Sequence, residues 1–383
     1  MPRTAAALAL ALLLAAPHAR AAPDEPAAYF FVGGRYVDDA GAQFMSGQMY
    51  VRHLPPTSPA RPGSPAAVPV VMVHGTAQTG TNFLGTPDGR PGWAQWFAAR
   101  GHDVYVVDQV GRGRSGQSER SYGPTTRFST RDVASLFTGP EAYSLYPQSG
   151  LHTQWPGGPG VPGNPAFDQF FASQVESIAS ALHSEELNDP ALVALLERTG
   201  PAILLTHSQS GAFGWKVADS HPELVRAVVA VEPNGPPFRD PAFHGGADWY
   251  TYPDTLARPY GITRVPLDFD PPAAAPADLA PALQPAPADP ALMRCVLQGG
   301  TPRRLPHLAT VPVAVVTAEA SFRASSDHCT VEFLAQAGVP VEHIALAEQG
   351  IHGNGHMMML ESDSDAIAAA IEAWLDRTLP PHP

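Results

Sequence analysis

Uninterrupted apolar runs alternate along the chain with segments whose apolar residues recur at helical spacing. Val68–Val73 is one such run, and a second lies within Asp103–Asp108. Strands without polar alternation are typical of a parallel sheet that is covered by helices on both faces. Between the two runs, Trp93–Arg100 has helical spacing and is followed by Gly101, a residue type that commonly ends a helix. This stretch is therefore predicted to form a β-α-β unit.

The same alternation of strands and helices returns after residue 165. The predicted helices are Asp168–Leu187, a short one that begins at Asp189-Pro190 and is closed by Gly200, Gly211–His221, Cys329–Gly338 and Asp365–Leu375. The predicted strands are Ala202–Leu205, Leu224–Val231, Val311–Thr317 and His343–Leu346, with two more near the N-terminus at Tyr29–Val37 and Gln48–His53. This order predicts an α/β fold with a mostly parallel central sheet and helices on both faces.

Two segments interrupt the alternation, at about residues 117–165 and 240–306. Both are rich in Pro, Gly and aromatic residues, and both are too long for plain connections within a compact domain. We expect them to be cap-like insertions over one end of the sheet. The alternative is surface decoration of a chain that is rich in proline throughout.

The N-terminus has the layout of a secretory signal peptide. Arg3 precedes the apolar run Ala5–Ala16, and Ala19–Ala21 supplies small residues for a cleavage site. A run of about a dozen residues is too short to span ~30 Å of hydrocarbon, and no later stretch reaches ~18 apolar residues, so no transmembrane segment is expected. We predict a signal peptide at residues 1–21 and an exported catalytic domain at residues 22–383.

Charge and cysteine content narrow the function classes further. The chain has 23 Lys and Arg against 36 Asp and Glu, a formal charge of −13, which argues against binding of nucleic acid. Hydrophobic residues make up 44% and charged residues 15%, enough apolar material for a large core.

In an oxidising compartment, Cys295 and Cys329 can form a disulfide; two buried free thiols are the alternative.

The strongest local signal for chemistry is the tight segment between the strand at 202–205 and the helix at 211–221. A strand-turn-helix context is what a nucleophile elbow needs to expose a serine hydroxyl, here Ser208. The usual pattern is G-x-S-x-G, but Thr206 and Ser210 occupy the glycine positions, and a threonine is large for that place. A serine that caps the following helix is the other interpretation.

A second signal follows the strand that ends at Val73. An α/β enzyme with a nucleophile elbow places an oxyanion donor at this point, so the backbone N–H groups of Thr76 and Gln209 are expected to face one carbonyl oxygen. An ordinary turn at Gly75 is the alternative.

Gly111–Gly116 matches the dinucleotide-binding pattern G-x-G-x-x-G after a strand. Pro124 and its polar surroundings argue against the helix that a dinucleotide site requires, so a tight turn is the better interpretation.

Candidates for a general base and its acid partner follow later strands. His352 and His356 lie in one Gly-rich loop, whose glycines argue against the helical face that a metal pair at this spacing would need. Glu232 and Glu319 each follow a predicted strand, and either carboxylate could orient a histidine.

Several motifs together resemble the atypical microbial esterase family of the α/β-hydrolase superfamily. They are His207–Gly211, Val231–Pro233, His352–Met359, Val32–Gly34, Gly47–Tyr50, Thr86–Gly89, Asp108-Gln109, Gly111–Ser115 and Thr153-Gln154. The resemblance covers most of the chain after residue 21, and it implies an α/β-hydrolase fold with Ser208 as nucleophile, His356 as base and Glu232 as acid after the sixth strand. One departure is that a member of that family has two adjacent cysteines where this chain has Thr76-Ala77.

The sequence therefore predicts a secreted serine carboxylic-ester hydrolase that works through an acyl-enzyme on a small-molecule ester. No cofactor and no metal are expected. A lactonase or amidase with the same triad is the alternative chemistry, and a hydrolase-fold binding protein without turnover is the alternative class. The sequence leaves the oligomeric state open, with a homodimer as one form.

Overall fold

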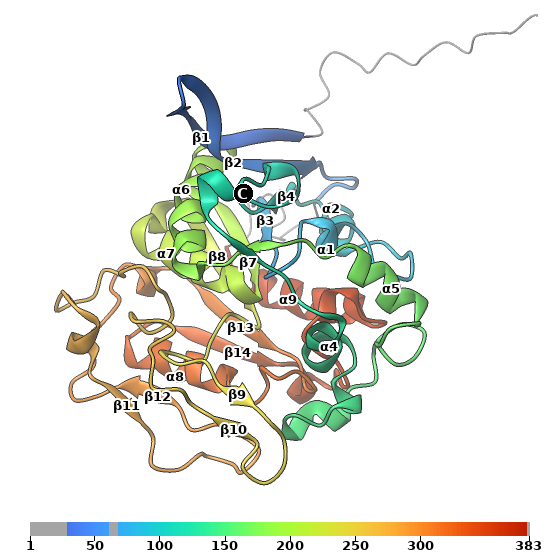
Figure 1. Cartoon of the computed structure of the whole chain (residues 1–383), viewed down its shortest axis with the longest axis vertical. Helices are drawn as coiled ribbons and strands as arrows, with labels where there is room; N and C mark the ends of the chain where they lie inside the picture. Colours follow the sequence, from blue (N-terminus) through green and yellow to red (C-terminus); the bar gives the residue numbers. More distant parts are fainter. Residues whose placement is uncertain (1–28, 61–67, 381–383) are drawn as a thin grey trace, which may run out of the picture.

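A sheet of eight strands runs through the computed structural model, which describes residues 29–60 and 68–380 (Figure 1). Its order is β1-β2-β4-β3-β7-β8-β13-β14. All neighbours from β4 to β14 are parallel, whereas β1 and β2 are antiparallel to their neighbours. The strands are β1 (Tyr29–Asp39), β2 (Ala42–Leu54), β3 (Val70–Val73), β4 (Val104–Asp108), β7 (Ala202–His207), β8 (Val225–Val231), β13 (Val313–Thr317) and β14 (Val341–Ala345). The predicted mostly parallel sheet is confirmed.

Helices cover the two faces of this sheet and bury one core on each. The helices that do so are α2 (Trp93–Ala98), α6 (Ala181–Thr199), α7 (Gly211–Ser220), α8 (Asp327–Gln336) and α9 (Ser364–Thr378). Successive residues of a strand point to opposite faces. Accordingly, Val71 packs in the core that includes α6, α7 and α8, and Met72 packs in the core that includes α2 and α9. The fully apolar runs of the sequence thus reflect burial on both faces.

The other helices and strands lie mainly in the connections between these layers. They are α1 (Thr81–Leu84), α3 (Glu119–Tyr122), β5 (Thr125–Thr126), α4 (Thr130–Val133), α5 (Pro165–Ala172), β6 (Ser177–Ile178), β9 (Ala242–Phe243), β10 (Tyr250–Thr251), β11 (Pro281–Leu283) and β12 (Val296–Gln298). Residues 117–165 hold α3, β5 and α4, and residues 240–306 hold β9 to β12. In Figure 1 the second of these segments lies beside α8.

The prediction for residues 168–200 is wrong in two places. The first helix, α5, ends at Ala172, and α6 is one helix of 19 residues that continues through Pro190 instead of starting there. The hydroxyl of Ser180 caps α6 by accepting the N–H of His183 at 3.2 Å. A proline inside a helix costs about 3 kcal/mol, but the buried leucines of α6 pack against the sheet and offset that cost. Tertiary packing therefore overrides the local Asp-Pro start signal.

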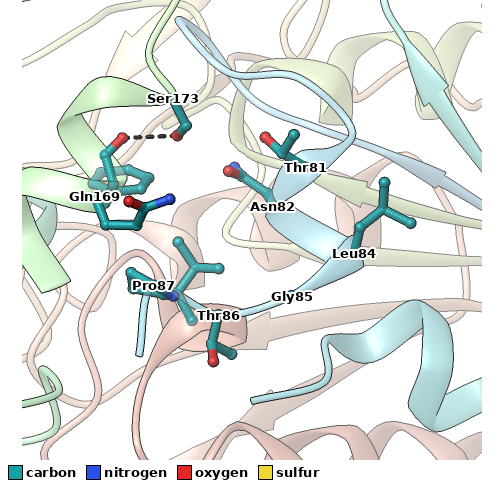
Figure 2. A pocket seen from close by; sticks show the side chains of 10 residues that line it. Thr81, Asn82, Leu84, Gly85, Thr86, Pro87, Gln169 and Ser173 are labelled. Atoms are coloured by element: carbon teal, nitrogen blue, oxygen red, sulfur yellow. Dashed lines mark hydrogen bonds between the residues drawn. The ribbon is translucent and has the colours of Figure 1, made fainter. Parts of the chain in front are cut away.

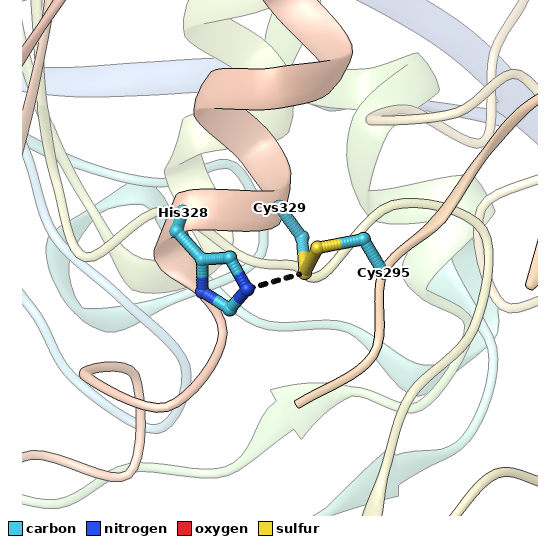
Figure 3. A group of neighbouring side chains, drawn as sticks. All are labelled: Cys295, His328 and Cys329. Carbon is cyan, nitrogen blue, oxygen red and sulfur yellow. Dashed lines mark hydrogen bonds between the residues drawn. A yellow bond between two sulfur atoms is a disulfide. The ribbon is translucent and has the colours of Figure 1, made fainter. Parts of the chain in front are cut away.

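A disulfide joins Cys295 to Cys329 and ties the second long segment to α8. The predicted pairing is present. His328 lies next to it, with Nε2 3.4 Å from the Cys329 sulfur (Figure 3). Because each sulfur is bonded to the other, this group of three side chains offers no thiolate to a metal ion.

The predicted signal peptide at residues 1–21 lies outside the described residues. Within residues 29–60 and 68–380, no helix combines the length and the hydrophobicity that crossing a bilayer requires.

Removal of the disulfide should lower the free energy of unfolding. The two cysteines are 34 residues apart, so the double variant Cys295→Ser/Cys329→Ser should lose about 3–4 kcal/mol in the chain-entropy view of crosslinks. Denaturant unfolding of the two proteins measures this loss, and the reduced wild-type protein should match the double variant. Equal unfolding free energies of the oxidised wild type and the double variant would contradict this role.

Candidate active site

The predicted site residues gather at one edge of the sheet, where the parallel strands end. Gly75 follows β3, Ser208 follows β7 and Glu232 follows β8, the sixth strand of the main sheet in chain order. His356 lies in the loop between β14 and α9. The carboxyl ends of parallel strands meet at the same edge, so residues far apart in the sequence become neighbours here.

Ser208 occupies a strained turn between β7 and α7. Its φ is +54°, a left-handed conformation that is uncommon for a residue with a side chain. Gly75 packs directly against this turn: a Cβ added at Gly75 would lie 3.0 Å from the Ser208 Cβ and 3.1 Å from His207 Nδ1. The side chain of Ser208 is covered, with 9% of the residue exposed. The backbone therefore has the form of a nucleophile elbow, closed over by neighbouring segments.

The two departures from G-x-S-x-G are accommodated by other residues of the elbow. A Cβ at Gly214 of α7 would lie 3.0 Å from the Thr206 Cγ2, so the missing side chain at Gly214 makes room for the threonine. The hydroxyl of Ser210 donates to the Val73 carbonyl at 2.7 Å and accepts the His207 N–H at 2.9 Å. Ser210 thus fastens the elbow to the end of β3, a bond that glycine could not make.

Glu232 and His356 form a buried pair beside this turn. The Nδ1 of His356 lies 2.6 Å from a carboxylate oxygen of Glu232. That carboxylate also accepts the Ser321 hydroxyl at 2.6 Å and the Ala318 N–H at 2.9 Å, so its oxygens are well bonded. The other ring nitrogen of His356, Nε2, is buried and has no hydrogen-bond partner among the described residues. One ring nitrogen is thus held by the Glu232 carboxylate, and the other has no hydrogen-bond partner among the described residues.

Burial dominates the electrostatics of this pair. It raises the pKa of the Glu232 carboxyl to about 8, against the opposing influence of the Ser321 and Ala318 hydrogen bonds and the nearby Arg323 charge. Burial also lowers the pKa of the His356 imidazole well below its usual value.

Three rings exclude water from the His356 imidazole. The centroids of the Phe137, Phe322 and His207 rings lie 5.1, 4.7 and 4.6 Å from the centroid of the imidazole. Their packing accounts for the desolvation that lowers its pKa.

The second histidine and the second carboxylate pair with each other outside this cluster. The Nδ1 of His352 lies 3.0 Å from Glu319, whose other oxygen accepts the Gly353 N–H at 2.9 Å. His352 is largely exposed, with 61% of its side chain accessible. The structure therefore brings Glu232 together with His356 in the interior, and it pairs the half-buried Glu319 with the exposed His352.

A buried network that the sequence did not reveal holds the loop that carries His356. Glu361 accepts the Gly355 N–H and the Asn354 side-chain amide at 3.0 Å, and it lies 2.8 Å from His152 Nε2. The other nitrogen of His152 lies 2.8 Å from Glu141. The two carboxylates raise the pKa of His152 to about 9 although its burial opposes this. The first long segment thus clamps the loop, and no local pattern around His152 marks this role.

A separate cavity of 270 Å³ lies between α1, the residues that follow it, and α5 (Figure 2). Its lining residues are Thr81, Asn82, Leu84, Gly85, Thr86, Pro87, Gln169, Phe170, Ser173 and Leu360. Ser208, Glu232 and His356 are not among them, so this cavity and the buried cluster are different places.

Known proteins share both the sequence and the architecture. Residues 68–261 match the family described as "alpha/beta hydrolase fold". The chain is 43% identical over 360 residues to "Probable secreted lipase phiG" of Fungal sp. (strain ATCC 74256), an alignment that covers 94% of this chain and 92% of that protein. A solved structure titled "The Atomic Resolution Structure of a Novel Bacterial Esterase" superposes with a TM-score of 0.58 at 23% identity, over 91% of this chain and 95% of that one, and this likeness concerns the fold.

The clamp at His152 should make stability depend on pH in the alkaline range. A histidine whose pKa is raised to about 9 stabilises the folded state fully below its unfolded pKa, near 6.5, and loses this effect as pH rises through 9. The contribution is on the order of 3 kcal/mol. Urea unfolding at pH 6, 7.5 and 9 should show a falling free energy for the wild type and a flatter profile for His152→Gln. The matched control, His352→Gln, should retain the slope of the wild type; equal slopes for the wild type and His152→Gln would contradict the clamp.

Proposed function

The chain belongs to the α/β-hydrolase fold family, and on this premise we propose that it is a secreted serine hydrolase that cleaves carboxylic esters. The observation that carries the proposal is the 2.6 Å contact between His356 and Glu232 beside the strained turn at Ser208. An acid, an imidazole with a free Nε2 and a serine at an elbow are the three parts of a serine-hydrolase triad. The relative named a probable secreted lipase supports ester chemistry.

In the proposed reaction, the Ser208 hydroxyl attacks the carbonyl carbon of the ester while Nε2 of His356 takes the hydroxyl proton. The tetrahedral intermediate then expels the alcohol, which receives that proton from the imidazolium, and an acyl-enzyme remains on Ser208. Water repeats the same steps: it gives its proton to His356, attacks the acyl carbon and releases the carboxylic acid. Ser208 recovers its proton, so the enzyme returns to its starting form.

Glu232 would hold the imidazole in the tautomer that leaves Nε2 free to accept a proton. Its carboxylate would also stabilise the imidazolium that forms during each half-reaction, in a place where water is excluded. The hydrogen bonds from Ser321 and Ala318 fix the direction of the carboxylate. An extra proton on the pair would occupy Nε2 and prevent it from acting as a base, so activity should require that the pair has lost this proton and keeps only the one on Nδ1.

The oxyanion would be bound by the backbone N–H groups of Thr76 and Gln209. Thr76 follows Gly75, which touches the elbow, and no acceptor for the Thr76 N–H is found within residues 29–60 and 68–380. Ala77 next to it has a φ of +60° and donates its N–H to the Ser177 hydroxyl at 2.8 Å, so hydrogen bonds restrain this loop.

The two long segments would act as caps over the site. Phe137 of the first segment lies against His356, and Phe243 of the second stacks against Trp249 and contacts Phe322. These aromatic rings cover the cluster and would form the apolar surroundings of the acyl group. Export to an oxidising compartment agrees with the predicted signal peptide at residues 1–21 and with the disulfide at Cys295.

Ser208→Ala should abolish ester hydrolysis and leave the fold intact. Triad nucleophiles contribute factors on the order of 10⁶ in turnover. The unfolding midpoint of the alanine variant should differ from that of the wild type by no more than a typical surface substitution would change it. The measurement is kcat on a series of p-nitrophenyl esters, with lactones and anilides assayed alongside. Ser220→Ala, at the far end of α7, is the matched control and should keep full activity. Turnover by Ser208→Ala within tenfold of the wild type would contradict a serine mechanism.

Amide variants of the two carboxylates separate the buried pair from the exposed one. Glu232→Gln preserves size but favours the wrong imidazole tautomer, so kcat should fall by roughly 10⁴. Glu319→Gln should lower kcat by less than about tenfold, because its partner His352 is not the base in this account. His356→Ala and His352→Ala should follow the same ranking. A reversed order, with all four variants folded by circular dichroism, would assign the acid and the base to the exposed pair.

A further inference from the structure

The glycine-rich turn after β4 directs one arginine into the interior. Gly111 and Gly113 have positive φ values of +80° and +47°, and a Cβ at Gly113 would lie 2.6 Å from an oxygen of Asp108. The turn is therefore restricted to glycine at that point, and Arg112 between the two glycines is buried, with 1% exposed. The next arginine, Arg114, is instead partly exposed, and it forms an ion pair with Asp108 at 2.8 Å.

Arg112 bonds to both segments of the proposed oxyanion site. Its Nη1 donates to the Gly75 carbonyl at 2.6 Å, and its Nη2 donates to the side-chain oxygen of Gln209 at 2.5 Å. Gly75 immediately precedes Thr76, and Gln209 immediately follows Ser208. One rigid, planar guanidinium thus spans the two backbone segments that would supply the oxyanion donors.

The bond to Gly75 fixes the direction of the Thr76 N–H. The carbonyl of Gly75 and the N–H of Thr76 belong to one peptide unit, which is planar and trans, so they point in opposite directions. His74 Nδ1 also contacts this carbonyl, at 2.9 Å, while its Nε2 accepts the Gln109 N–H at 3.0 Å. Two donors therefore hold the carbonyl on the side away from the nucleophile, and they polarise the peptide so that its N–H becomes a stronger donor.

The guanidinium is not neutralised at close range. Within the described ranges, no carboxylate forms an ion pair with Arg112, and burial lowers its pKa to about 9, which still leaves it charged at neutral pH. A buried charge without a paired carboxylate is costly and is retained where it has a use. Here it lies next to the place where negative charge would develop.

We propose that Arg112 is a positioning residue that aligns and polarises the oxyanion hole by bridging the Gly75 carbonyl and the Gln209 side chain. The inference rests on the proposed function, because it acts through the Thr76 and Gln209 N–H groups. It predicts that Arg112 stabilises the oxyanion in the transition state and contributes little to the binding of uncharged ester.

The test compares Arg112→Met, Arg112→Lys and the matched control Arg114→Met, which removes an arginine from the same turn without touching the elbow. The measurements are kcat and KM on one p-nitrophenyl ester, normalised to active sites titrated exhaustively with an organophosphate, and the Ki of a trifluoromethyl ketone. That ketone forms a tetrahedral oxyanion with the nucleophile, so its Ki reports on the hole.

Arg112→Met should lower kcat about 100-fold, the size expected for loss of one oxyanion donor, and should raise the ketone Ki by a similar factor. KM should change less than about threefold, because the ester ground state carries no charge at this place. Arg112→Lys keeps the charge but cannot donate to both partners from a planar fork, so it should recover only part of kcat. Arg114→Met should resemble the wild type.

If Arg112→Met does not fold, Gln209→Met tests the other end of the bridge and should give the same kcat and Ki pattern at smaller amplitude. Unchanged kcat and Ki per titrated site in the variants, a loss confined to KM, or an equal loss in Arg114→Met would overturn the inference while the esterase function stands. Wild-type protein that neither hydrolyses esters nor reacts at Ser208 would instead remove the proposed function, and this inference with it.

Discussion

A carboxylate and an imidazole meet at 2.6 Å in a place that water does not reach, and the rest of the site is arranged around this contact. Burying Glu232 raises its pKa, so the ionised form needs help from its surroundings. That help comes from the Ala318 N–H, the Ser321 hydroxyl and the charge of Arg323. The residues just after β13 therefore supply hydrogen-bond partners for the Glu232 carboxylate at the end of β8.

The same contact requires that the loop carrying His356 be held from its other side. Three separate groups do this: His207 reaches the His356 carbonyl at 3.0 Å, Thr153 donates its N–H to Gly353 at 2.9 Å, and Glu361 binds the Gly355 N–H. Thr153 belongs to the first long segment, so that segment supports the loop of His356 and also covers the imidazole through Phe137. A change in the first long segment should therefore also displace the loop that carries His356, and a change in that loop should displace the segment.

Sequence patterns were sufficient to predict where Ser208 and Glu232 lie, because each follows an apolar run that is buried on both faces. The strand before His356 is half-exposed and carries Glu342 and His343, so the position of this histidine was predicted from the Gly-rich loop alone. They could not decide between Glu232 and Glu319, since both follow strands and only the folded loop shows which histidine each one contacts. His152 and Glu361 are 209 positions apart, and no local spacing connects them. The sequence does hold a clue to the space for Thr206. Gly214, whose missing side chain makes that space, lies in the predicted helix that follows. The break predicted at Pro190 failed because packing of α6 outweighed a local signal.

The measurement that tests the central claim most directly is the rate of fluorophosphonate labelling as a function of pH, with the modified residue identified by peptide mass spectrometry. The account predicts a single adduct, on Ser208, formed at a rate that rises with pH as the Glu232–His356 pair loses its extra proton, with the rise centred near the raised pKa of about 8. No adduct, an adduct on another residue, or a labelling rate that does not change between pH 6 and pH 9 would contradict it.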